Sequence, residues 1–564
     1  MTVRSELSRR SLLAAPAALC GAGRPSETMT EGKEITVSNA ALATEPEEAV
    51  RAGARMLQAG GNAFDAAAAA ALATGVLQQE LCGLGGYVAC GLVLEGKTGR
   101  VWSIDSNSAA PASAREDLYR VLPKASSPAG LNENEYGVSV DGNSNVHGPL
   151  AVGVPGQLGG IGILQERWGR LKWRQVLAPT EELVANGFPY RNTARSIANQ
   201  QAVIRRFDAT AQYLMPDGAP PAVDDIWRPA GLQTTLRRLA EAGWRDFYRG
   251  ELGKKIADHV QLLGGLLTRD DMARFEPRVG QGYRGSYRGA EVYACPLANG
   301  GLTCLQALHM LECFDPLPDS EPGYWHRLAE VLKLCWRDRL RYFGDPDQGD
   351  VEVSKFLSKE FAADRVKPLR QFPDRVDQIP GPAAGASPGT THISAGDREG
   401  NLVALTVSHG GLFGSAVTVP GTGIILGHGM CRFDPRPGRA NSPGPFKRPL
   451  NNVCPTIVRL PDRDVALGLR GGRRIVSVAT QLVVRVVDHG HSPAAAANAP
   501  RLHIEEHEPL ELTEKAGASA VERLEQMGHK VKRAPGVGGW AHIVERFKKQ
   551  NKIRAGGDIW AAGV

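Results

Sequence analysis

Thr390 stands where an irregular loop gives way to a predicted β-hairpin. Residues 371–389 contain many prolines and glycines, which is typical of an exposed loop without regular structure. Apolar and polar residues then alternate in a first strand, residues 397–401 form a turn, and residues 402–407 form a second strand. A hairpin that pairs the two end residues of this turn places Ser408 opposite Thr390, at a separation of about 5 Å. We therefore expect a second hydroxyl to face Thr390.

Cleavage of the chain between Gly389 and Thr390 would give this threonine a chemical role. A threonine hydroxyl alone is a poor nucleophile and needs a neighbouring base. The free α-amine of a new N-terminus has a pKa of about 7.7–8.0, so one residue would carry both nucleophile and base. Gly389 suits the cleavage site because a residue without Cβ can adopt the strained backbone that self-cleavage requires. An ordinary junction between loop and hairpin is the alternative, and Gly-Thr-Thr alone would favour it.

The glycine pair Gly471-Gly472 is a second element that suits acyl-transfer chemistry. It lies between a predicted strand at residues 464–469 and a predicted helix at residues 475–487. Successive backbone N–H groups at a helix N-terminus bind negative charge, and in acyl transfer such donors hold the oxyanion of the tetrahedral intermediate. A simple turn is the alternative, which the junction alone would favour. Beside a threonine nucleophile, the pair is the best candidate for an oxyanion hole.

The composition is that of a large globular protein. With 564 residues the chain is too long for one small core, so we expect two modules or one large layered α/β body. The net charge of +6 is mild and no basic block is interleaved with aromatic residues, so nucleic acid is not an expected partner. The nine cysteines are scattered without a CxxC pair, which indicates small buried side chains and neither a disulfide framework nor a zinc site.

The first residues predict an export signal. Residues 8–13 (Ser-Arg-Arg-Ser-Leu-Leu) form a twin-arginine pattern, and a short apolar run follows at residues 12–22. This run is too short to span a bilayer, and the sequence contains no other transmembrane candidate. We expect residues 1–23 to direct the folded protein to the periplasm or the exterior. A coincidental arginine pair in a disordered start is the alternative, and the bulky Leu19 disfavours a lipoprotein site at Cys20.

The elements around these residues alternate between helix and strand. Residues 47–60 predict a helix that ends at a glycine pair, and the alanine-rich residues 65–74 predict a second, buried helix. Strands are predicted at residues 87–94 and 101–104. Residues 154–345 are mainly helical in pattern, so we expect this region to pack outside the sheets.

Residues 390–401 have the pattern Thr-Thr-His-x-Ser-x-x-Asp-x-x-Gly-Asn, and other short motifs accompany it. These motifs are 60–67 (Gly-Gly-Asn-Ala-x-Asp-Ala-Ala), 154–156 (Val-Pro-Gly), 338–347 (Asp-Arg-x-x-Tyr-x-Gly-Asp-Pro-Asp), 447–450 (Lys-Arg-Pro-Leu), 455–456 (Pro-Thr) and 471–475 (Gly-Gly-x-Arg-Ile). The set resembles the γ-glutamyltranspeptidase family, in the family's order, from about residue 36 to near the end. One motif alone is weak evidence, but the ordered set is specific.

The resemblance implies a four-layer αββα sandwich of the N-terminal-nucleophile hydrolase type, an α/β protein that cleaves itself into two subunits that stay together. These would be a large subunit, residues 24–389, and a small subunit, residues 390–564, with Thr390 as nucleophile. By position in the motifs, Ser408 would touch the α-amine of Thr390, and Gly471-Gly472 would form the oxyanion hole. The implied activity is that of a γ-glutamyltransferase or glutathione hydrolase. A small-molecule amide would acylate the enzyme without a cofactor or metal, and the acyl group would pass to water or an amine.

Several departures from the family's pattern fall in its donor pocket. The family holds the α-carboxylate of a γ-glutamyl donor with an arginine in an Arg-Glu pair, where this chain has Asn107-Ser108. An acidic residue of the family holds the α-ammonium, where this chain has Arg432. Asn451-Asn452 replace a Ser-Ser pair, and Gly410 replaces an asparagine. Asn107, Arg432, Asn451 and Asn452 are therefore the candidates for substrate binding, in a pocket that has largely lost the groups for a glutamyl amino acid.

The cation at position 432 predicts a different donor. An unpaired positive charge that faces a substrate cation costs free energy in a pocket of low dielectric constant. We therefore hypothesise a donor acyl group that lacks the α-ammonium and carries extra negative charge, such as the mono-amide of a dicarboxylic acid. The alternative, equally open, is that Arg432 turns outward or pairs with a protein carboxylate.

Two further functions remain open at this stage. One is an acylase for non-glutamyl amides, such as those of β-lactam side chains, and the other is a secreted binding protein that is never cleaved. Near the predicted site, His392, His409, His428 and Cys431 match no standard zinc spacing, so we expect no metal. His409, beside Ser408, is a candidate for polarising the water that releases the acyl group.

Overall fold

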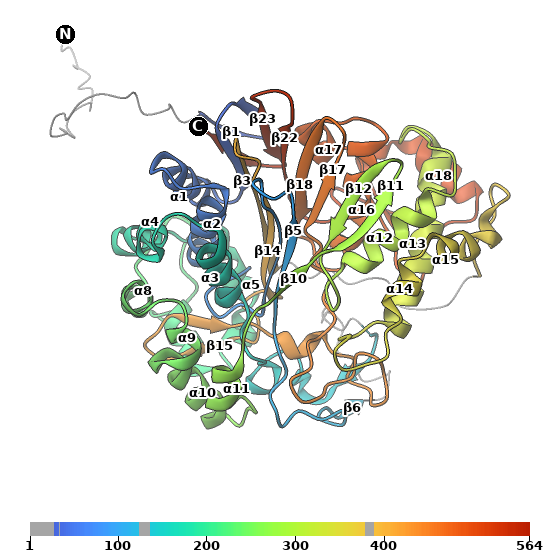
Figure 1. Cartoon of the computed structure of the whole chain (residues 1–564). Coiled ribbons are helices and arrows are strands. Elements are labelled where there is room, and N and C mark those ends of the chain that lie inside the picture. The colour runs from blue at the N-terminus through green and yellow to red at the C-terminus, as the bar shows by residue number, and fades with distance from the viewer. Residues whose placement is uncertain (1–27, 33, 123–135, 378–388) are drawn as a thin grey trace, which may run out of the picture.

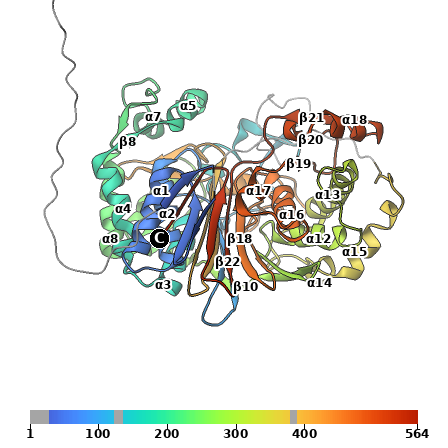
Figure 2. The same ribbon diagram turned by 90° about the horizontal axis from the view of Figure 1, so that it is seen from above.

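Two large β-sheets face each other in the centre of the molecule, and helices cover their outer sides. This arrangement is seen in a computed structural model of the chain, which describes residues 28–32, 34–122, 136–377 and 389–564 (Figure 1). Figure 2 shows the two sheets nearly edge-on between two groups of helices. The predicted export signal at residues 1–23 lies outside the described residues, as does the end of the loop that precedes Gly389.

The first sheet has eight antiparallel strands, and its centre is the predicted hairpin, β13 (Gly389–Asp397) and β14 (Leu402–Gly410). Its order is β1 (Thr28–Glu31), β24 (Trp560–Gly563), β3 (Ala40–Thr44), β13, β14, β4 (Val88–Leu94), β5 (Val101–Asn107) and β10 (Arg278–Gln281). The strand predicted at residues 101–104 continues to Asn107 because it pairs with β4 on one side and β10 on the other.

The second sheet has seven antiparallel strands. Its order is β11 (Tyr283–Tyr287), β12 (Ala290–Ala294), β17 (Thr456–Arg459), β18 (Arg463–Leu469), β22 (Ala541–Phe547), β23 (Ile553–Gly557) and β2 (Ile35–Val37). The prediction that residues 154–345 pack outside the sheets is wrong for residues 278–294, which form β10, β11 and β12. β10 is an edge strand of the first sheet and β11 one of the second, while β12 lies between β11 and β17 and alternates buried with half-buried residues.

Small sheets complete the strands. They are β6 (Val121–Leu122) with β7 (Ser139–Val140), β8 (Phe188–Pro189) with β9 (Ile226–Trp227), β15 (Val417–Val419) with β16 (Ile424–Leu426), and β19 (Leu502–His503) with β20 (Leu510–Thr513) and β21 (Val531–Ala534).

The helices form one group on each outer side of the sheet pair (Figure 2). The group beside the first sheet contains α1 (Glu47–Gln58), α2 (Ala63–Leu77), α3 (Gln157–Trp168), α4 (Trp173–Asn186), α5 (Asn192–Asn199), α6 (Gln201–Ile204), α7 (Asp208–Leu214), α8 (Ala230–Ala242), α9 (Asp246–Arg249), α10 (Glu251–Leu262) and α11 (Arg269–Arg274). The group beside the second sheet contains α12 (Gly301–Leu311), α13 (Pro322–Tyr342), α14 (Val353–Phe356), α15 (Lys359–Arg365), α16 (Arg474–Val487), α17 (Pro493–Asn498) and α18 (Ala518–Gln526). Among the helices of the described residues, none combines the length and apolar character needed to cross a membrane.

The predicted buried helix is α2, which packs on the hairpin. It begins at Asn62, whose side chain accepts the N–H groups of Phe64 and Asp65, while the Asp65 carboxylate accepts the N–H of Asn62. This reciprocal cap fixes the start of the helix. Every residue of α2 is buried, because its small alanine side chains let α1 and the first sheet approach closely.

Side-chain alternation along the hairpin decides which residues face the second sheet. Val403 and Leu405 pack among the helices, whereas Leu402 and Ala404 pack between the two sheets. Successive side chains of a strand point to opposite faces, so Ser408 shares the inner face with Leu402. Thr390, which Ser408 contacts, therefore also lies on the inner face, at one end of the sheet pair.

Candidate active site

A pair of buried hydroxyls forms the centre of the site, and the predicted hairpin register that brings them together is confirmed. Thr390 Oγ1 lies 2.9 Å from Ser408 Oγ, and Thr390 is 4% exposed. Ser408 Oγ accepts the N–H of Gly410 at 2.8 Å and donates its own proton to the carbonyl oxygen of Gly389. The Thr390 hydroxyl must then donate within the pair. Ser408 thus connects the Thr390 hydroxyl to the carbonyl group of the predicted cleavage site.

Gly389 is required by close packing. A Cβ at this position would lie 2.5 Å from the carbonyl oxygen of Gly410 and 2.6 Å from that of Gly411. Its φ lies outside the left-handed region, so the strained backbone expected from the sequence is not the reason for this glycine in the intact chain. The strand pairing shifts register between Gly389 and Thr390, and such a bulge bends the backbone at the predicted cleavage site.

The glycine pair Gly471-Gly472 joins β18 to α16, as the sequence predicts. Its φ angles are +143° and +58°, values that favour glycine. Within the described part of the chain, no acceptor receives the N–H of either glycine. Their carbonyl oxygens accept the N–H groups of Arg474 and Ile475 and so close the first turn. The two N–H groups are therefore unused donors among the described residues, and their role as an oxyanion hole stays a prediction.

A chain of buried contacts holds this glycine pair beside the hairpin. Arg470, directly before the pair, forms an ion pair of 3.4 Å with Glu45. The same carboxylate oxygen accepts the hydroxyl of Thr391, the residue after the nucleophile, at 3.0 Å. The Arg470 guanidinium also lies 3.9 Å from the ring centre of Trp540. Glu45 therefore connects the glycine turn of the second sheet to the hairpin of the first.

Asn107 lies in one row with the hydroxyl pair. Thr390 pairs with Ser408, Ser408 with Val88, and Val88 with Asn107, across four adjacent strands. Because neighbouring strands are about 4.8 Å apart, the Asn107 backbone lies about 14 Å from that of Thr390. Asn107 Nδ2 donates to the carbonyl oxygen of Pro449 at 2.6 Å, while Oδ1 has no partner among the described residues. Asn107 therefore lies on the β5 side of the nucleophile with one acceptor oxygen unused.

Arg432 is buried against the nucleophile hairpin. It is 3% exposed, and its guanidinium lies 5.7 Å from the ring centre of Tyr87. Its Nη2 lies 3.1 Å from the point where a side chain on Gly410 would begin. The alternative that Arg432 turns outward is therefore wrong. Burial, together with the charge of Arg432, lowers the pKa of His428 well below its ordinary value, so Arg432 lies close to His428. The other alternative, that Arg432 pairs with a protein carboxylate, stays untested.

Asn451 and Asn452 are held by other parts of the protein. Asn451 Nδ2 donates to Asn299 Oδ1 at 2.8 Å, and its Oδ1 accepts the N–H of Val453 at 3.0 Å. Asn452 Oδ1 accepts a hydrogen bond of 2.9 Å from Arg339. These bonds fix the loop that carries both asparagines, and contact of either with a substrate stays a prediction.

Comparison with known proteins assigns this arrangement to a family. A sequence model described as gamma-glutamyltranspeptidase matches residues 49–564. The chain belongs to the γ-glutamyltranspeptidase family. The Acylase ACY 1 proenzyme of Pseudomonas sp. (strain V22) is 34% identical to it over 531 residues, which are 92% of each chain. The glutathione hydrolase proenzyme of Bacillus subtilis (strain 168) is 30% identical over 538 residues, 91% of this chain and 89% of the relative.

A solved structure supports the same assignment. The cephalosporin acylase from Bacillus halodurans superposes with a TM-score of 0.82 at 26% identity, covering 97% of this chain and 99% of that one. This γ-glutamyltranspeptidase homologue is therefore an N-terminal-nucleophile hydrolase or transferase that acts on amides. The family and the enzyme class predicted from the motifs are confirmed.

Three histidines near the site are buried, and burial disfavours their charged form. Burial lowers the pKa of His392 and His428 well below the ordinary value and lowers that of His409 to about 3. His428 Nε2 accepts the N–H of Gly411 at 2.6 Å. His409 lies on the face of β14 opposite Ser408, and its ring packs so close to Gly83 that a Cβ there would lie 2.8 Å from Nε2. The prediction that His409 polarises a water beside Ser408 is therefore wrong.

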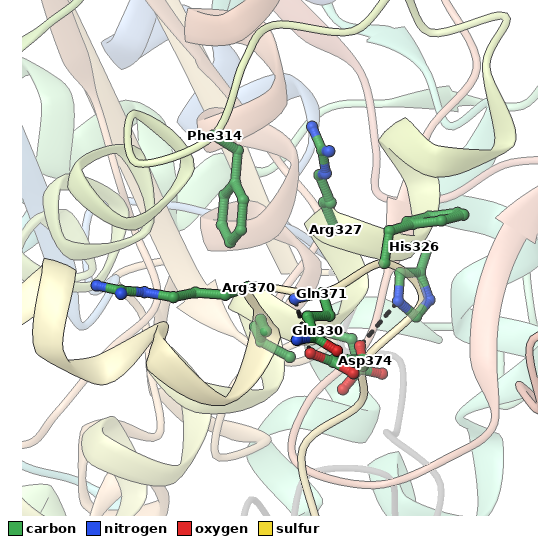
Figure 3. Close-up of a pocket in the computed structure, with 9 residues that line it drawn as sticks. Phe314, His326, Arg327, Glu330, Arg370, Gln371 and Asp374 are labelled. Atoms are coloured by element: carbon green, nitrogen blue, oxygen red, sulfur yellow. Dashed lines mark hydrogen bonds between the residues drawn. The ribbon is translucent and has the colours of Figure 1, made fainter.

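One group of side chains in the described residues has the spacing of metal ligands, and it lies on α13 and near α18. It consists of His326, Glu330 and His529, and Figure 3 shows His326 and Glu330 at the wall of a small pocket. His326 Nδ1 lies 2.9 Å from His529 Nε2, and Lys333 Nζ lies 2.7 Å from both Glu330 and Glu508. The ammonium group of Lys333 already compensates the carboxylates, so we interpret the cluster as a structural network.

Glu45 is the site residue that sequence reasoning missed. It is fully buried at the end of β3, where it contacts Thr391 and Arg470. An acidic residue directly after an apolar strand and before Pro46 is unusual, because glutamate is almost never fully buried unless it is paired. This position is the signal that would have identified it.

Proposed function

We propose that the chain is a precursor that cuts itself between Gly389 and Thr390. The mature enzyme then has a large subunit, residues 24–389, and a small subunit, residues 390–564, and uses Thr390 to form an acyl-enzyme. The observation that carries the proposal is the contact of Ser408 Oγ with both Thr390 Oγ1 and the Gly389 carbonyl oxygen. The names of the relatives, acylase proenzyme and glutathione hydrolase proenzyme, also support a precursor.

The proposed cleavage follows from these contacts. Thr390 Oγ attacks the carbonyl carbon of Gly389, and the Ser408 hydroxyl stabilises the negative charge that develops on the carbonyl oxygen. The C–N bond breaks, the α-amine of Thr390 takes the hydroxyl proton, and the acyl group of Gly389 remains as an ester on Thr390. Water hydrolyses this ester, which restores the hydroxyl beside a free α-amine.

The mature site uses the same atoms on a substrate amide. The α-amine of Thr390 takes the proton of its own hydroxyl while Oγ attacks the substrate's carbonyl carbon. The N–H groups of Gly471 and Gly472 hold the oxyanion, where losing one such donor costs about 10²–10³ in rate. The substrate's C–N bond breaks, the amine leaves with the proton, and water or another amine then takes the acyl group from Thr390.

We infer that the preferred donor carries no α-ammonium, because Arg432 brings a buried cation to the end of the nucleophile hairpin. Two unit charges of like sign 4 Å apart repel by about 4 kcal/mol at an effective dielectric constant of 20. This energy corresponds to a rate factor of about 10³. A glutaryl group is a γ-glutamyl group without its α-ammonium, so the two acyl groups isolate this single interaction.

The experiment compares glutaryl-p-nitroanilide with γ-glutamyl-p-nitroanilide, using Thr390→Ala as the inactive reference. We expect the wild type to prefer the glutaryl donor and Arg432→Asp to reverse that preference. Arg436→Asp makes the same charge change four residues away, where Arg436 is paired with Asp434, and is expected to keep the wild-type preference. A wild type that prefers the γ-glutamyl donor and loses it in Arg432→Asp contradicts the inference.

Glutathione hydrolysis is the second candidate, favoured by the name of the Bacillus subtilis relative. It predicts preference for the γ-glutamyl donor in the same experiment. The third hypothesis is a binding protein that is never cleaved. It predicts one band on a denaturing gel, where a processed enzyme gives two.

Two finer features belong to the same proposal. We propose that the facing sheets and their two groups of helices form the four-layer αββα sandwich of N-terminal-nucleophile hydrolases, which the superposition on the cephalosporin acylase supports. We also propose that residues 1–23 export the folded precursor, on the evidence of the twin-arginine pattern.

A further inference from the structure

A cavity of about 230 Å³ opens beside the buried carboxylate of Glu45. Its walls are mainly apolar and aromatic, and its polar members are two carboxylates, two amides, a threonine hydroxyl and an arginine. The lining residues are Glu45, Pro46, Leu77, Gln78, Glu80, Phe188, Pro189, Tyr190, Arg191, Asn192, Thr193, Trp540, Ile559 and Trp560. A cavity of about 150 Å³ holds a benzene ring, so this one, which we call the Glu45 pocket, has room for an aromatic ring and a short linker.

Two of the polar side chains that line the Glu45 pocket, Glu45 and Gln78, each have a buried acceptor oxygen without a partner among the described residues. Glu45 is 0% exposed, and while its Oε1 binds Thr391, its Oε2 has no hydrogen-bond partner among the described residues. Gln78 Oε1 is a second buried acceptor without a partner there. Burying an unsatisfied acceptor costs about 1–3 kcal/mol, so two of them in one pocket indicate a ligand that supplies N–H donors.

Glu80 adds to this acceptor character. Its carboxylate accepts the hydroxyl of Thr193 at 2.7 Å, and burial raises its pKa to about 7. Glu80 and Glu45, the latter ion-paired with Arg470, thus give the pocket two carboxylates, while the aromatic side chains of Tyr190, Trp540 and Trp560 form part of its wall. An amine with an apolar or aromatic body matches both parts.

The order of strands places this pocket on one side of the nucleophile. In the first sheet β3 and β14 are the two neighbours of β13, which carries Thr390. Asn107 and Arg432, the candidates for the acyl side, lie across β14 and beyond it. Glu45 follows β3 on the other side and touches Thr391. Glu45 therefore lies on the β3 side of Thr390, and an amide bound across Thr390 with its acyl group over β14 would extend its amine to that same side.

The pocket also reaches the oxyanion side of the site. Trp540 forms part of its wall, and Arg470, which stacks on Trp540, directly precedes Gly471. Arg470 N–H donates to the Trp540 carbonyl oxygen at 3.2 Å. One end of the pocket is thus fixed to the residues that are proposed to hold the scissile carbonyl group.

We propose that the Glu45 pocket binds the amine half of the substrate: the leaving amine during acylation, and the acceptor amine during transfer. The inference rests on the proposed function, since it assumes that Thr390 forms the acyl-enzyme. Its ligand class is a primary amine with one aromatic ring or an apolar body of similar size. Glu45 Oε2 accepts an N–H of the bound amine and so determines specificity.

Acylation and transfer both exchange a C–N bond and a C–O bond at the same carbonyl carbon. Attack by Thr390 Oγ forms the C–O bond, the C–N bond breaks, and the proton from the Thr390 hydroxyl reaches the nitrogen by way of the α-amine. The released amine carries at least two N–H groups, of which one is directed at Glu45 Oε2. In transfer the reverse occurs: the amine nitrogen attacks the ester carbon, and its proton returns through the α-amine to Thr390 Oγ.

The test uses pairs of amides that share an acyl group and differ in the amine: glutaryl-2-phenylethylamide with glutaramic acid, and the γ-glutamyl counterparts of both. The quantity compared is the ratio of kcat/KM for the phenylethylamide to kcat/KM for the primary amide. In the wild type we expect this ratio to exceed 10. In Trp560→Ala we expect it to fall at least tenfold, and Gln78→Leu is a second variant expected to lower it by a smaller factor.

Trp102→Ala is the matched control, because Trp102 is also a half-buried tryptophan of the first sheet but lies outside the pocket. It is expected to keep the wild-type ratio. Competitive inhibition of the wild type by 2-phenylethylamine, weakened at least tenfold in Trp560→Ala, is the matching binding measurement. A ratio near 1 in the wild type, or equal ratios in wild type and both pocket variants, overturns the proposal.

Different results would overturn the proposed function and the pocket assignment. If the wild type releases no amine from any of the four amides and equals Thr390→Ala, the proposed function fails, and the pocket assignment fails with it. If the wild type forms the acyl-enzyme but its ratio of kcat/KM for the phenylethylamide to that for the primary amide is near 1, only the pocket assignment fails.

Discussion

Replacement of Ser408 by alanine is the perturbation whose effect the structure specifies most closely. The variant removes the hydroxyl that donates to the Gly389 carbonyl oxygen and accepts from Thr390. Loss of one donor to a developing oxyanion costs about 10²–10³ in rate, which corresponds to about 2.7–4 kcal/mol. The N–H of Gly410 also loses its acceptor, which costs about 1–3 kcal/mol of folding stability. We therefore expect Ser408→Ala to fold and to cleave itself at least a hundredfold more slowly.

The assay is a time course of purified precursor on a denaturing gel, with the thermal midpoint measured on the same samples. Ser415→Ala is the matched control. Ser415 is equally buried, donates to the carbonyl oxygen of Leu426 at 2.7 Å and accepts the N–H of Val417 at 3.3 Å, so it loses the same kinds of bond away from Thr390. We expect this control to be destabilised to a similar extent and cleaved at the wild-type rate.

Two results would refute the reasoning. One is a folded Ser408→Ala protein that is cleaved as fast as the wild type. The other is an equal loss of cleavage in Ser408→Ala and Ser415→Ala, because the effect would then follow stability and not the contact with Gly389.

Three further predictions concern packing, capping and pH. Gly389→Ala places a Cβ 2.5 Å from the Gly410 carbonyl oxygen and is expected to cost about 1–3 kcal/mol and to slow cleavage on the same gel. Asn62→Ala removes the cap of α2 and is expected to lower the free energy of unfolding by about 0.5–2 kcal/mol in denaturant titrations, whereas Asn498→Ala, at the exposed end of α17, should change it little. Burial alone would raise the pKa of Glu505. The charge of Arg473 and a side-chain hydrogen bond with His503 instead lower this pKa to about 2. Because this pKa is depressed in the folded state, Glu505 stabilises the protein above pH 4.5 and loses that contribution as the pH falls toward 2. Glu505→Gln is therefore expected to flatten the dependence of stability on pH in that range, and an unchanged slope would contradict the assignment.

The parts of the site that could be predicted from the sequence depend on local geometry. Ser408 faces Thr390 because a short turn fixes the register of its own hairpin. Gly471-Gly472 sits between a strand and a helix that are adjacent in sequence, so its backbone donors could also be predicted. In both cases residues that are close in the sequence determine the position of the group.

The parts that could not be predicted depend on contacts between distant segments. Glu45 meets Thr391 across 346 positions of sequence, and nothing near either residue indicates the contact. Residues 278–294 look like a connection within a helical region, yet they form strands because β10 pairs with β5 and β12 pairs with β17, both distant in the sequence. The inward orientation of Arg432 likewise follows from the packing of Gly410 and Tyr87 around it.

The identity of the first residue of the small fragment tests the central claim most directly. Purified, folded protein is separated on a denaturing gel, and the smaller band is analysed by N-terminal sequencing and intact mass. We predict a small fragment that begins with Thr390 in the wild type and is absent from Thr390→Ala. A catalytically active preparation that contains only the uncut chain, or a cut at another bond, would contradict it.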